Sequence, residues 1–216
     1  MSISAQDRAR KIKVILFDVD GVLTDGTLWL IPGSPAPAGE MMGEILGAAN
    51  KDIGFGVESK TLVEAKGYCA HDGIAISLAR LGGLKCGVIT KRISETVATR
   101  ARDLRLEFVY QGQAYKMRAV REICAKEGMA LDEICYVADD IIDLPVMREC
   151  GLAIAVANAR PQVKAEAHFV TPNRGGYGAG RDAVEFILES RGILGQCIET
   201  YLDEGNEKAP QVGDSQ

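Results

Sequence analysis

The stretch that decides the fold is Lys11–Gly26, KIKVILFDVDGVLTDG. It begins with an apolar run of strand length, Lys11–Phe17, and turns polar at once at Asp18 and Asp20. A strand that is apolar along its whole length is typical of a parallel sheet with both faces covered. Ligands of such sheets bind outside the carboxyl ends of the strands, so the two aspartates stand where chemistry is expected.

Further apolar runs alternate with segments of helical period along the rest of the chain. We predict the remaining core strands at residues 86–90, 107–110, 134–138, 152–156 and 168–170. We predict helices at residues 72–81, 94–104, 116–127 and 181–191. We also predict a helix that passes through residues 145 and 149, and a short helix with residue 161 in its first turn. This alternation predicts an α/β fold of three layers, a Rossmann-like parallel sheet between two layers of helices.

Length and composition fit one globular α/β domain. The chain has 216 residues, of which 47% are hydrophobic and 25% charged. The net charge of -5 argues against a nucleic-acid-binding surface and against a polybasic membrane patch. The sequence has neither a secretory signal nor an apolar run that could span a bilayer, so we expect a cytoplasmic protein. The six cysteines form no Cys-x-x-Cys pair and are expected to be reduced core thiols.

The predicted domain covers residues 1–203, and residues 204–216 are expected to form a mobile polar tail. Within it, the Gly/Pro-rich stretch of about 26–70 is predicted to be a hairpin with a long excursion at its tip. This composition cannot build a core of its own. We therefore hypothesise that the hairpin lies at a subunit interface or over the mouth of the active site.

Polar residues gather at the predicted strand ends. Asp18 and Asp20 follow the first strand, Thr90 ends the second, and Asp139 with Asp140 follows a later one. Burying such carboxylates together without a partner would cost several kcal/mol, so a bound cation is the natural compensation. Hard oxygen ligands favour magnesium. The sequence therefore predicts a magnesium site at this edge of the sheet.

The chain resembles the haloacid dehalogenase superfamily of phosphohydrolases. Four motifs carry the resemblance, in this order: DVDGVLTDG at 18–26, VIT at 88–90, Lys116 after YQGQ, and DDIID at 139–143. The longer patterns YQGQ-x-x-K and ADD-x-x-DLPVM further resemble the family of 3-deoxy-D-manno-octulosonate 8-phosphate phosphatases. That resemblance implies a β-hairpin flap, no large cap domain, and a phosphomonoester hydrolase that uses Mg²⁺ and an aspartyl-phosphate.

The resemblance also implies a partner and a substrate. The substrate would be a phosphorylated sugar acid of lipopolysaccharide synthesis, and the enzyme would be a homotetramer. Two alternatives stay open: a phosphatase of nonulosonate 9-phosphates or other small sugar phosphates, and a catalytically silent module for assembly or regulation. The complete set of motif residues argues against the silent module, which has no need for that arrangement of charges.

Roles for the principal residues follow from the resemblance. Asp18 would be the nucleophile and a magnesium ligand. Asp20 would protonate the leaving oxygen and then deprotonate the attacking water, with its backbone carbonyl also on the metal. Thr90 and Lys116 would hold the phosphoryl oxygens, and Asp139 would ligate magnesium.

The remaining candidates would support these residues. Asp143 would orient metal-bound water or the motif lysine, and Asp140 would either assist it or only hold its loop through backbone N–H groups. Arg92 would meet the phosphate or the carboxylate of the sugar acid. Asp72 and Gly73 would either contact the substrate or merely begin a helix.

The chain departs from the family pattern at several places. The stretch before Asp72 is longer than the family's hairpin, and His71, Lys91 and Tyr177 stand where the family usually has Arg, Gly and Arg. All of these positions are expected to lie where the enzyme would recognise the leaving group. They therefore bear on the identity of the sugar more than on the reaction.

Overall fold

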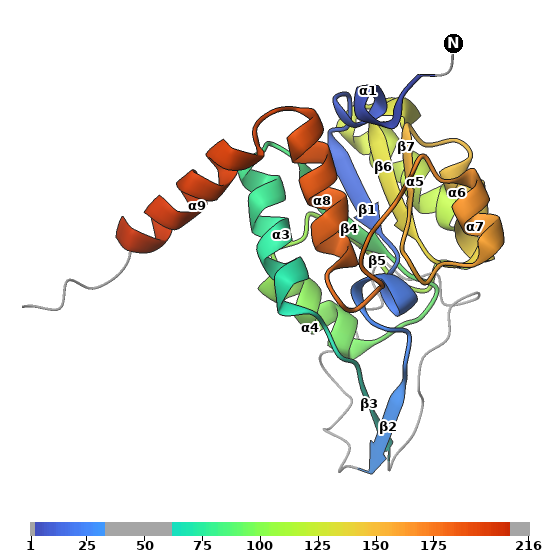
Figure 1. Cartoon of the computed structure of the whole chain (residues 1–216). Coiled ribbons are helices and arrows are strands. Elements are labelled where there is room, and N and C mark those ends of the chain that lie inside the picture. The colour runs from blue at the N-terminus through green and yellow to red at the C-terminus, as the bar shows by residue number, and fades with distance from the viewer. Residues whose placement is uncertain (1–2, 33–61, 208–216) are drawn as a thin grey trace, which may run out of the picture.

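Six parallel strands form the centre of the molecule, in the order β5-β4-β1-β6-β7-β8 (Figure 1). The computed structural model describes residues 3–32 and 62–207. The strands of this sheet are β1 Val14–Phe17, β4 Lys85–Ile89, β5 Phe108–Tyr110, β6 Ile134–Ala138, β7 Leu152–Ala155 and β8 Phe169–Val170. All four residues of β1 are fully buried, as the apolar run predicts.

Helices cover both faces of the sheet. They are α1 Ala5–Ala9, α3 Ala70–Leu81, α4 Glu95–Asp103, α5 Lys116–Glu127, α6 Leu144–Met147, α7 Pro161–Glu166, α8 Ala179–Ser190 and α9 Leu194–Glu207. Figure 1 shows α3 and α8 packed together on one side, and α5, α6 and α7 on the other. The predicted three-layer α/β architecture is thereby confirmed.

The strand order brings the ends of three strands together. Strand β1 lies between β4 and β6, and Phe17 at its end pairs with Val88 on one side and Val137 on the other. Because the strands are parallel, their carboxyl ends meet at one edge. The residues that follow β1, β4 and β6 are therefore neighbours in space although they are far apart in sequence.

A two-stranded antiparallel hairpin leaves the domain close to β1. Its strands are β2 Trp29–Pro32 and β3 Leu62–Ala65, and Trp29 pairs with Ala65. The predicted hairpin is thus confirmed at its base, which points away from the sheet in Figure 1. The predicted excursion at its tip, residues 33–61, lies outside the described residues.

The helix α9 was not predicted. It continues to Glu207, past residue 203, where a mobile tail was expected to begin, and residues 208–216 lie outside the described part. Its buried Cys197 and partly buried Ile198 pack on the core, and the helix contacts α3 and α8. This packing stabilises a segment whose glycines and polar residues give it low helix propensity.

Two further findings concern the cysteines and the length of the described helices. All six cysteines are free, and five of them are buried, as expected for core thiols. No helix within residues 3–32 and 62–207 is both long enough and apolar enough to cross a membrane.

The carboxylate of Asp72 joins α3 to the beginning of α8. Its Oδ1 accepts the backbone N–H of Arg181 at 2.9 Å, and the residue is 4% exposed. Its Oδ2 is buried with no hydrogen-bond partner in the described part of the chain. Burial raises the pKa of Asp72 to about 6. The carboxyl group therefore helps to align two helices but is held in an environment that disfavours its charge.

We predict that Asp72→Asn makes the protein less sensitive to pH. The folded protein keeps the Asp72 proton to a higher pH than the unfolded chain does, so wild-type stability falls as the pH rises from about 4 to 6. The free energy of unfolding of the variant minus that of wild type should increase by about 1–2 kcal/mol from pH 5 to pH 7. Urea denaturation at the two pH values measures this shift, and an unchanged difference would contradict it.

Candidate active site

The turn after β1 is shaped by Asp18 and Gly21. The Asp18 Oδ1 accepts the backbone N–H of Val19 at 2.7 Å. Gly21 has φ +91°, and a Cβ added to it would lie 2.1 Å from Asp139 Oδ2. The glycine of the D-x-D-G motif thus serves two needs, because it permits the left-handed backbone and leaves room for the carboxylate of Asp139.

A buried lysine links two of the carboxylates. The Lys116 Nζ lies 2.8 Å from Asp18 Oδ1 and 2.7 Å from Asp143 Oδ1, and its side chain is 1% exposed. The Tyr136 hydroxyl donates a hydrogen bond to the same oxygen, Asp143 Oδ1, at 2.8 Å. Lys116 is the first residue of α5, and Tyr136 belongs to β6. Ion pairs therefore join the sheet and the helix layer at the site, in addition to the apolar packing of the core.

The electrostatics of the group follow from burial and from crowding of like charges. Burial alone would lower the pKa of Lys116, but the carboxylates of Asp18 and Asp143 outweigh it and raise that pKa. Burial, together with the charge of Asp18, raises the pKa of Asp143 to about 8. Burial and the same neighbour raise the pKa of Asp139 to about 7. One lysine does not offset all the negative charge that gathers here.

Three of these carboxylates could hold a divalent cation. Asp18, Asp139 and Asp143 each offer one oxygen, and these oxygens lie within 4.8 Å of one another. Asp139 Oδ1 and Asp143 Oδ2 are buried and have no hydrogen-bond partner among the described residues. Carboxylate oxygens of this kind are the ligands that magnesium prefers. Asp143, which was expected only to orient other groups, thus belongs to the potential ligand group.

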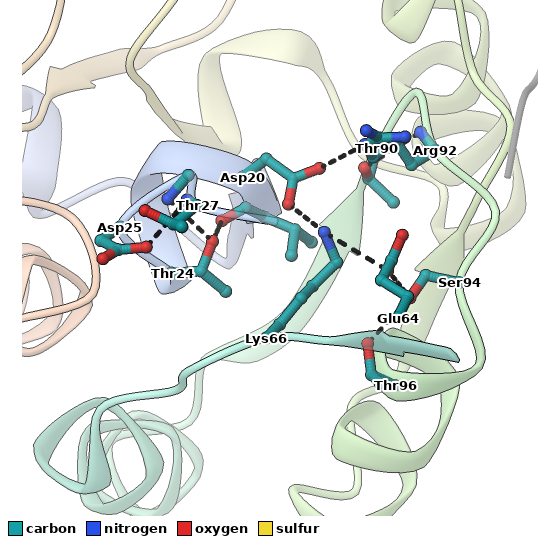
Figure 2. Close-up of polar contacts among 12 residues, drawn as sticks. Asp20, Thr24, Asp25, Thr27, Glu64, Lys66, Thr90, Arg92, Ser94 and Thr96 are labelled. Carbon is teal, nitrogen blue, oxygen red and sulfur yellow. Dashed lines mark hydrogen bonds and ion pairs between the residues drawn. The ribbon is translucent and has the colours of Figure 1, made fainter. Parts of the chain in front are cut away.

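The carboxylate of Asp20 lies apart from this group and faces cations. Its Oδ2 is 3.6 Å from Arg92 Nε, and its Oδ1 accepts a hydrogen bond from Lys66 Nζ. Figure 2 shows Asp20 between the two cationic side chains, with Thr90 beside Arg92. The proposed ligation of a metal by the backbone carbonyl of Asp20 stays a prediction.

Thr90 lies at the end of β4, where the motif places it. It is 2% exposed, its backbone N–H donates to Tyr110 O at 2.9 Å, and its Oγ1 accepts the N–H of Arg92 at 3.3 Å. Both hydrogen bonds fix the loop that follows the strand. The side chains of Thr90 and Arg92 are therefore presented at the same edge as Asp20.

Other candidates lie at the margin of the site. Asp140 is exposed, and its Oδ1 accepts the N–H of Ile141 at 2.7 Å, which fits the reading that it holds its loop. Asp72 contacts the start of α8, and a Cβ on Gly73 would meet the guanidinium of Arg100 at 2.8 Å. Both thus contact neighbouring helices, and a role for them at the substrate stays a prediction.

Several residues that support the site carry no motif in the sequence. The Asn158 side chain donates to Gly21 O at 3.3 Å and accepts the N–H of Gly175 at 2.7 Å, which holds the glycine-rich loop after β8 against the first motif. Tyr136 and Lys66 were also missed. Tyr136 stands within an apolar strand, and Lys66 contacts Asp20 only because of the hairpin's register, so neither carries a signal in the sequence.

Comparisons with known proteins agree with this geometry. Residues 88–178 match the family of haloacid dehalogenase-like hydrolases. The 3-deoxy-D-manno-octulosonate 8-phosphate phosphatase of Escherichia coli is 31% identical over 197 residues, which are 91% of this chain and 90% of that protein. The chain belongs to this family of haloacid dehalogenase-like phosphatases.

Solved structures of the octulosonate phosphatase family are also similar. The structure of the Yersinia pestis enzyme superposes on this chain with a TM-score of 0.72 and 29% sequence identity, and the match covers 88% of each chain. The Moraxella catarrhalis enzyme, solved with a magnesium ion, a phosphate ion and a KDO molecule, has a TM-score of 0.74 at 28% identity. That match covers 91% of this chain and 97% of the other. The protein is accordingly a hydrolase of phosphomonoesters, and the silent-module alternative is set aside.

We predict that Asp139→Asn has opposite effects on stability with and without magnesium. Without a divalent cation at pH 8, the substitution removes a buried charge beside Asp18 and should raise the free energy of unfolding by about 1 kcal/mol or more. With millimolar Mg²⁺, wild type should gain stability by ligand linkage while the variant gains little. Thermal melts in chelator and in Mg²⁺ test this, and an equal response of both proteins to Mg²⁺ would contradict it.

Proposed function

We propose that the protein hydrolyses 3-deoxy-D-manno-octulosonate 8-phosphate by way of an aspartyl-phosphate on Asp18. The observation that carries the proposal is the buried Lys116, held between Asp18 and Asp143 at the edge where the other motif residues meet. Relatives named for this substrate, similar over nearly the whole chain, support the choice of sugar.

The reaction would use the two aspartates of the first motif in turn. The Asp18 carboxylate attacks phosphorus, the bond to the sugar oxygen breaks, and Asp20 gives its proton to that oxygen. Water then attacks the phosphorus of the aspartyl-phosphate while Asp20 takes up a proton from it. Inorganic phosphate leaves, and both carboxylates return to their starting state.

The surrounding residues would hold charge and geometry during transfer. Lys116 keeps the Asp18 carboxylate oriented and offsets negative charge at the phosphoryl group, and Thr90 offers its hydroxyl to a phosphoryl oxygen. Magnesium would be held by Asp18 and Asp139, with Asp143 or the backbone of Asp20 beside them. When bound, the ion would shield the charges of the phosphate and its nucleophile.

Substrate recognition would combine this site with cations at its rim. Arg92 lies beside Asp20, and a guanidinium suits the carboxylate of a sugar acid. The activity would serve the synthesis of lipopolysaccharide. We also infer a cytoplasmic location, where the six unpaired thiols would stay reduced.

We predict that Asp18→Asn abolishes Mg²⁺-dependent phosphate release. An amide cannot form the acyl-phosphate, so turnover should fall by about a thousandfold or more while the fold stays intact. Phosphate release from octulosonate 8-phosphate and from a nonulosonate 9-phosphate, with and without Mg²⁺, measures both the mechanism and the preference. The matched control is Asp132→Asn in the exposed turn before β6. Wild-type turnover by Asp18→Asn would rule out the mechanism.

We further propose that the protein is a homotetramer assembled through its hairpin. One face of the hairpin exposes neighbouring apolar side chains, with Trp29 60%, Ile31 47% and Val63 42% exposed, and Leu30 on the opposite face is 50% exposed. A cluster of this kind on a two-stranded ribbon is typical of an interaction surface.

We predict that replacing Trp29 and Ile31 with Ser yields a smaller species in sedimentation velocity. The loss of apolar area removes the main favourable contribution to association. Ser substitution of the exposed Leu202 on α9 is the control, since it lies far along the chain from the hairpin. Unchanged sedimentation of the double variant would exclude this surface as the interface.

A further inference from the structure

The hairpin sends one cationic side chain into the site. Lys66 directly follows β3, and its side chain is fully buried. Its Nζ donates to Asp20 Oδ1 and lies 3.5 Å from Glu64 Oε1. Figure 2 shows Lys66 extending from the hairpin strand to a point between these two carboxylates. A buried ammonium group without partners would cost several kcal/mol, so this pairing determines where the side chain can lie.

Two cationic side chains face the carboxylate of Asp20, one at each oxygen. Lys66 binds Oδ1 from the hairpin, while Arg92 faces Oδ2 from the loop after β4. An aspartate side chain without such contacts samples several staggered rotamers. Contacts from two separate elements restrict it to one orientation.

The end of β3 is itself fastened to the domain. The Ser94 hydroxyl donates to Glu64 Oε1 at 2.5 Å, and the Ser94 N–H donates to Gln111 Oε1 at 2.7 Å. Ser94 comes immediately before α4, and Gln111 follows β5. A chain of hydrogen bonds and ion pairs therefore runs from the sheet through Ser94 and Glu64 to Lys66.

We propose that Lys66 is a positioning residue that holds Asp20 for proton transfer to the leaving oxygen. This proposal rests on the proposed function, in which Asp20 supplies that proton. It assigns the hairpin a part in the chemistry, because the base of the hairpin orients a group that acts on the substrate. Lys66 does so through Asp20 and not by contact with the phosphoryl group.

The choice of leaving group separates this role from a structural one. A sugar alkoxide is a poor leaving group and needs a proton as its bond to phosphorus breaks, whereas 4-nitrophenolate leaves without one. Loss of the orientation of Asp20 should therefore slow the sugar phosphate selectively. General damage to the fold or to the phosphate site would slow both substrates alike.

The test compares Lys66→Met with wild type on octulosonate 8-phosphate and on 4-nitrophenyl phosphate, both with Mg²⁺. We expect kcat/KM for the sugar phosphate to fall by about tenfold to a hundredfold, through kcat, and for the aryl phosphate by less than about threefold. Lys66→Arg should restore part of the loss. Equal losses on both substrates, a change confined to KM, or no loss would overturn the proposal.

A double-mutant cycle tests whether Lys66 acts through Asp20. On an Asp20→Asn background, Lys66→Met should cause little further loss, because the group that it positions is already gone. Independent, multiplicative losses would contradict the proposal. Lys66→Gln, which keeps an N–H donor, replaces the Met variant throughout if thermal melts show that the latter does not fold.

A lysine at the opposite edge of the sheet provides the matched control. Lys85 begins β4, and its ammonium pairs with Glu127. Lys85→Met should leave both rates unchanged. The controls also separate the two hypotheses: phosphate release by wild type from neither substrate would refute the proposed function, whereas active wild type without a selective loss in the variants would refute only the role of Lys66.

Discussion

The ion pairs of Lys116 with Asp18 and Asp143 are the interaction on which the site depends. All three side chains are nearly or fully excluded from water, so the attraction between them has to offset the cost of burying each charge. Removing one partner of such a group typically costs about 3–5 kcal/mol. The lysine also ties the start of α5 to the ends of β1 and β6. Catalytic geometry and packing of the domain are thus maintained by the same contacts.

This constraint explains why the surrounding glycines and polar groups are arranged as they are. Gly21 leaves room for Asp139, and Tyr136 gives Asp143 a donor within an otherwise apolar strand. Asn158 then holds the glycine-rich loop against Gly21. The site still has more negative charge than Lys116 balances, which is a physical reason for such a protein to capture a divalent cation.

The hairpin contacts the first motif through Lys66. One face of the hairpin exposes Trp29 and Ile31, while Lys66 at its base reaches Asp20. A partner that covers the apolar face would therefore act on a ribbon whose base contacts Asp20, the proposed acid–base residue. Lys91 directly follows Thr90 in the loop after β4.

The sequence by itself determined the sheet, most of its helices and the candidates for the reacting residues, because apolar periodicity and the order of the four motifs are local signals. Asp18, Thr90, Lys116 and Asp139 could be named for this reason. Only the tertiary structure decided that Asp143 joins the potential ligand group, that Asp72 fastens α8, and that α9 is a helix. Only the tertiary structure showed that Lys66 lies beside Asp20. These features depend on strand order, hairpin register and packing between segments far apart along the chain, and such contacts leave no periodic trace in the sequence.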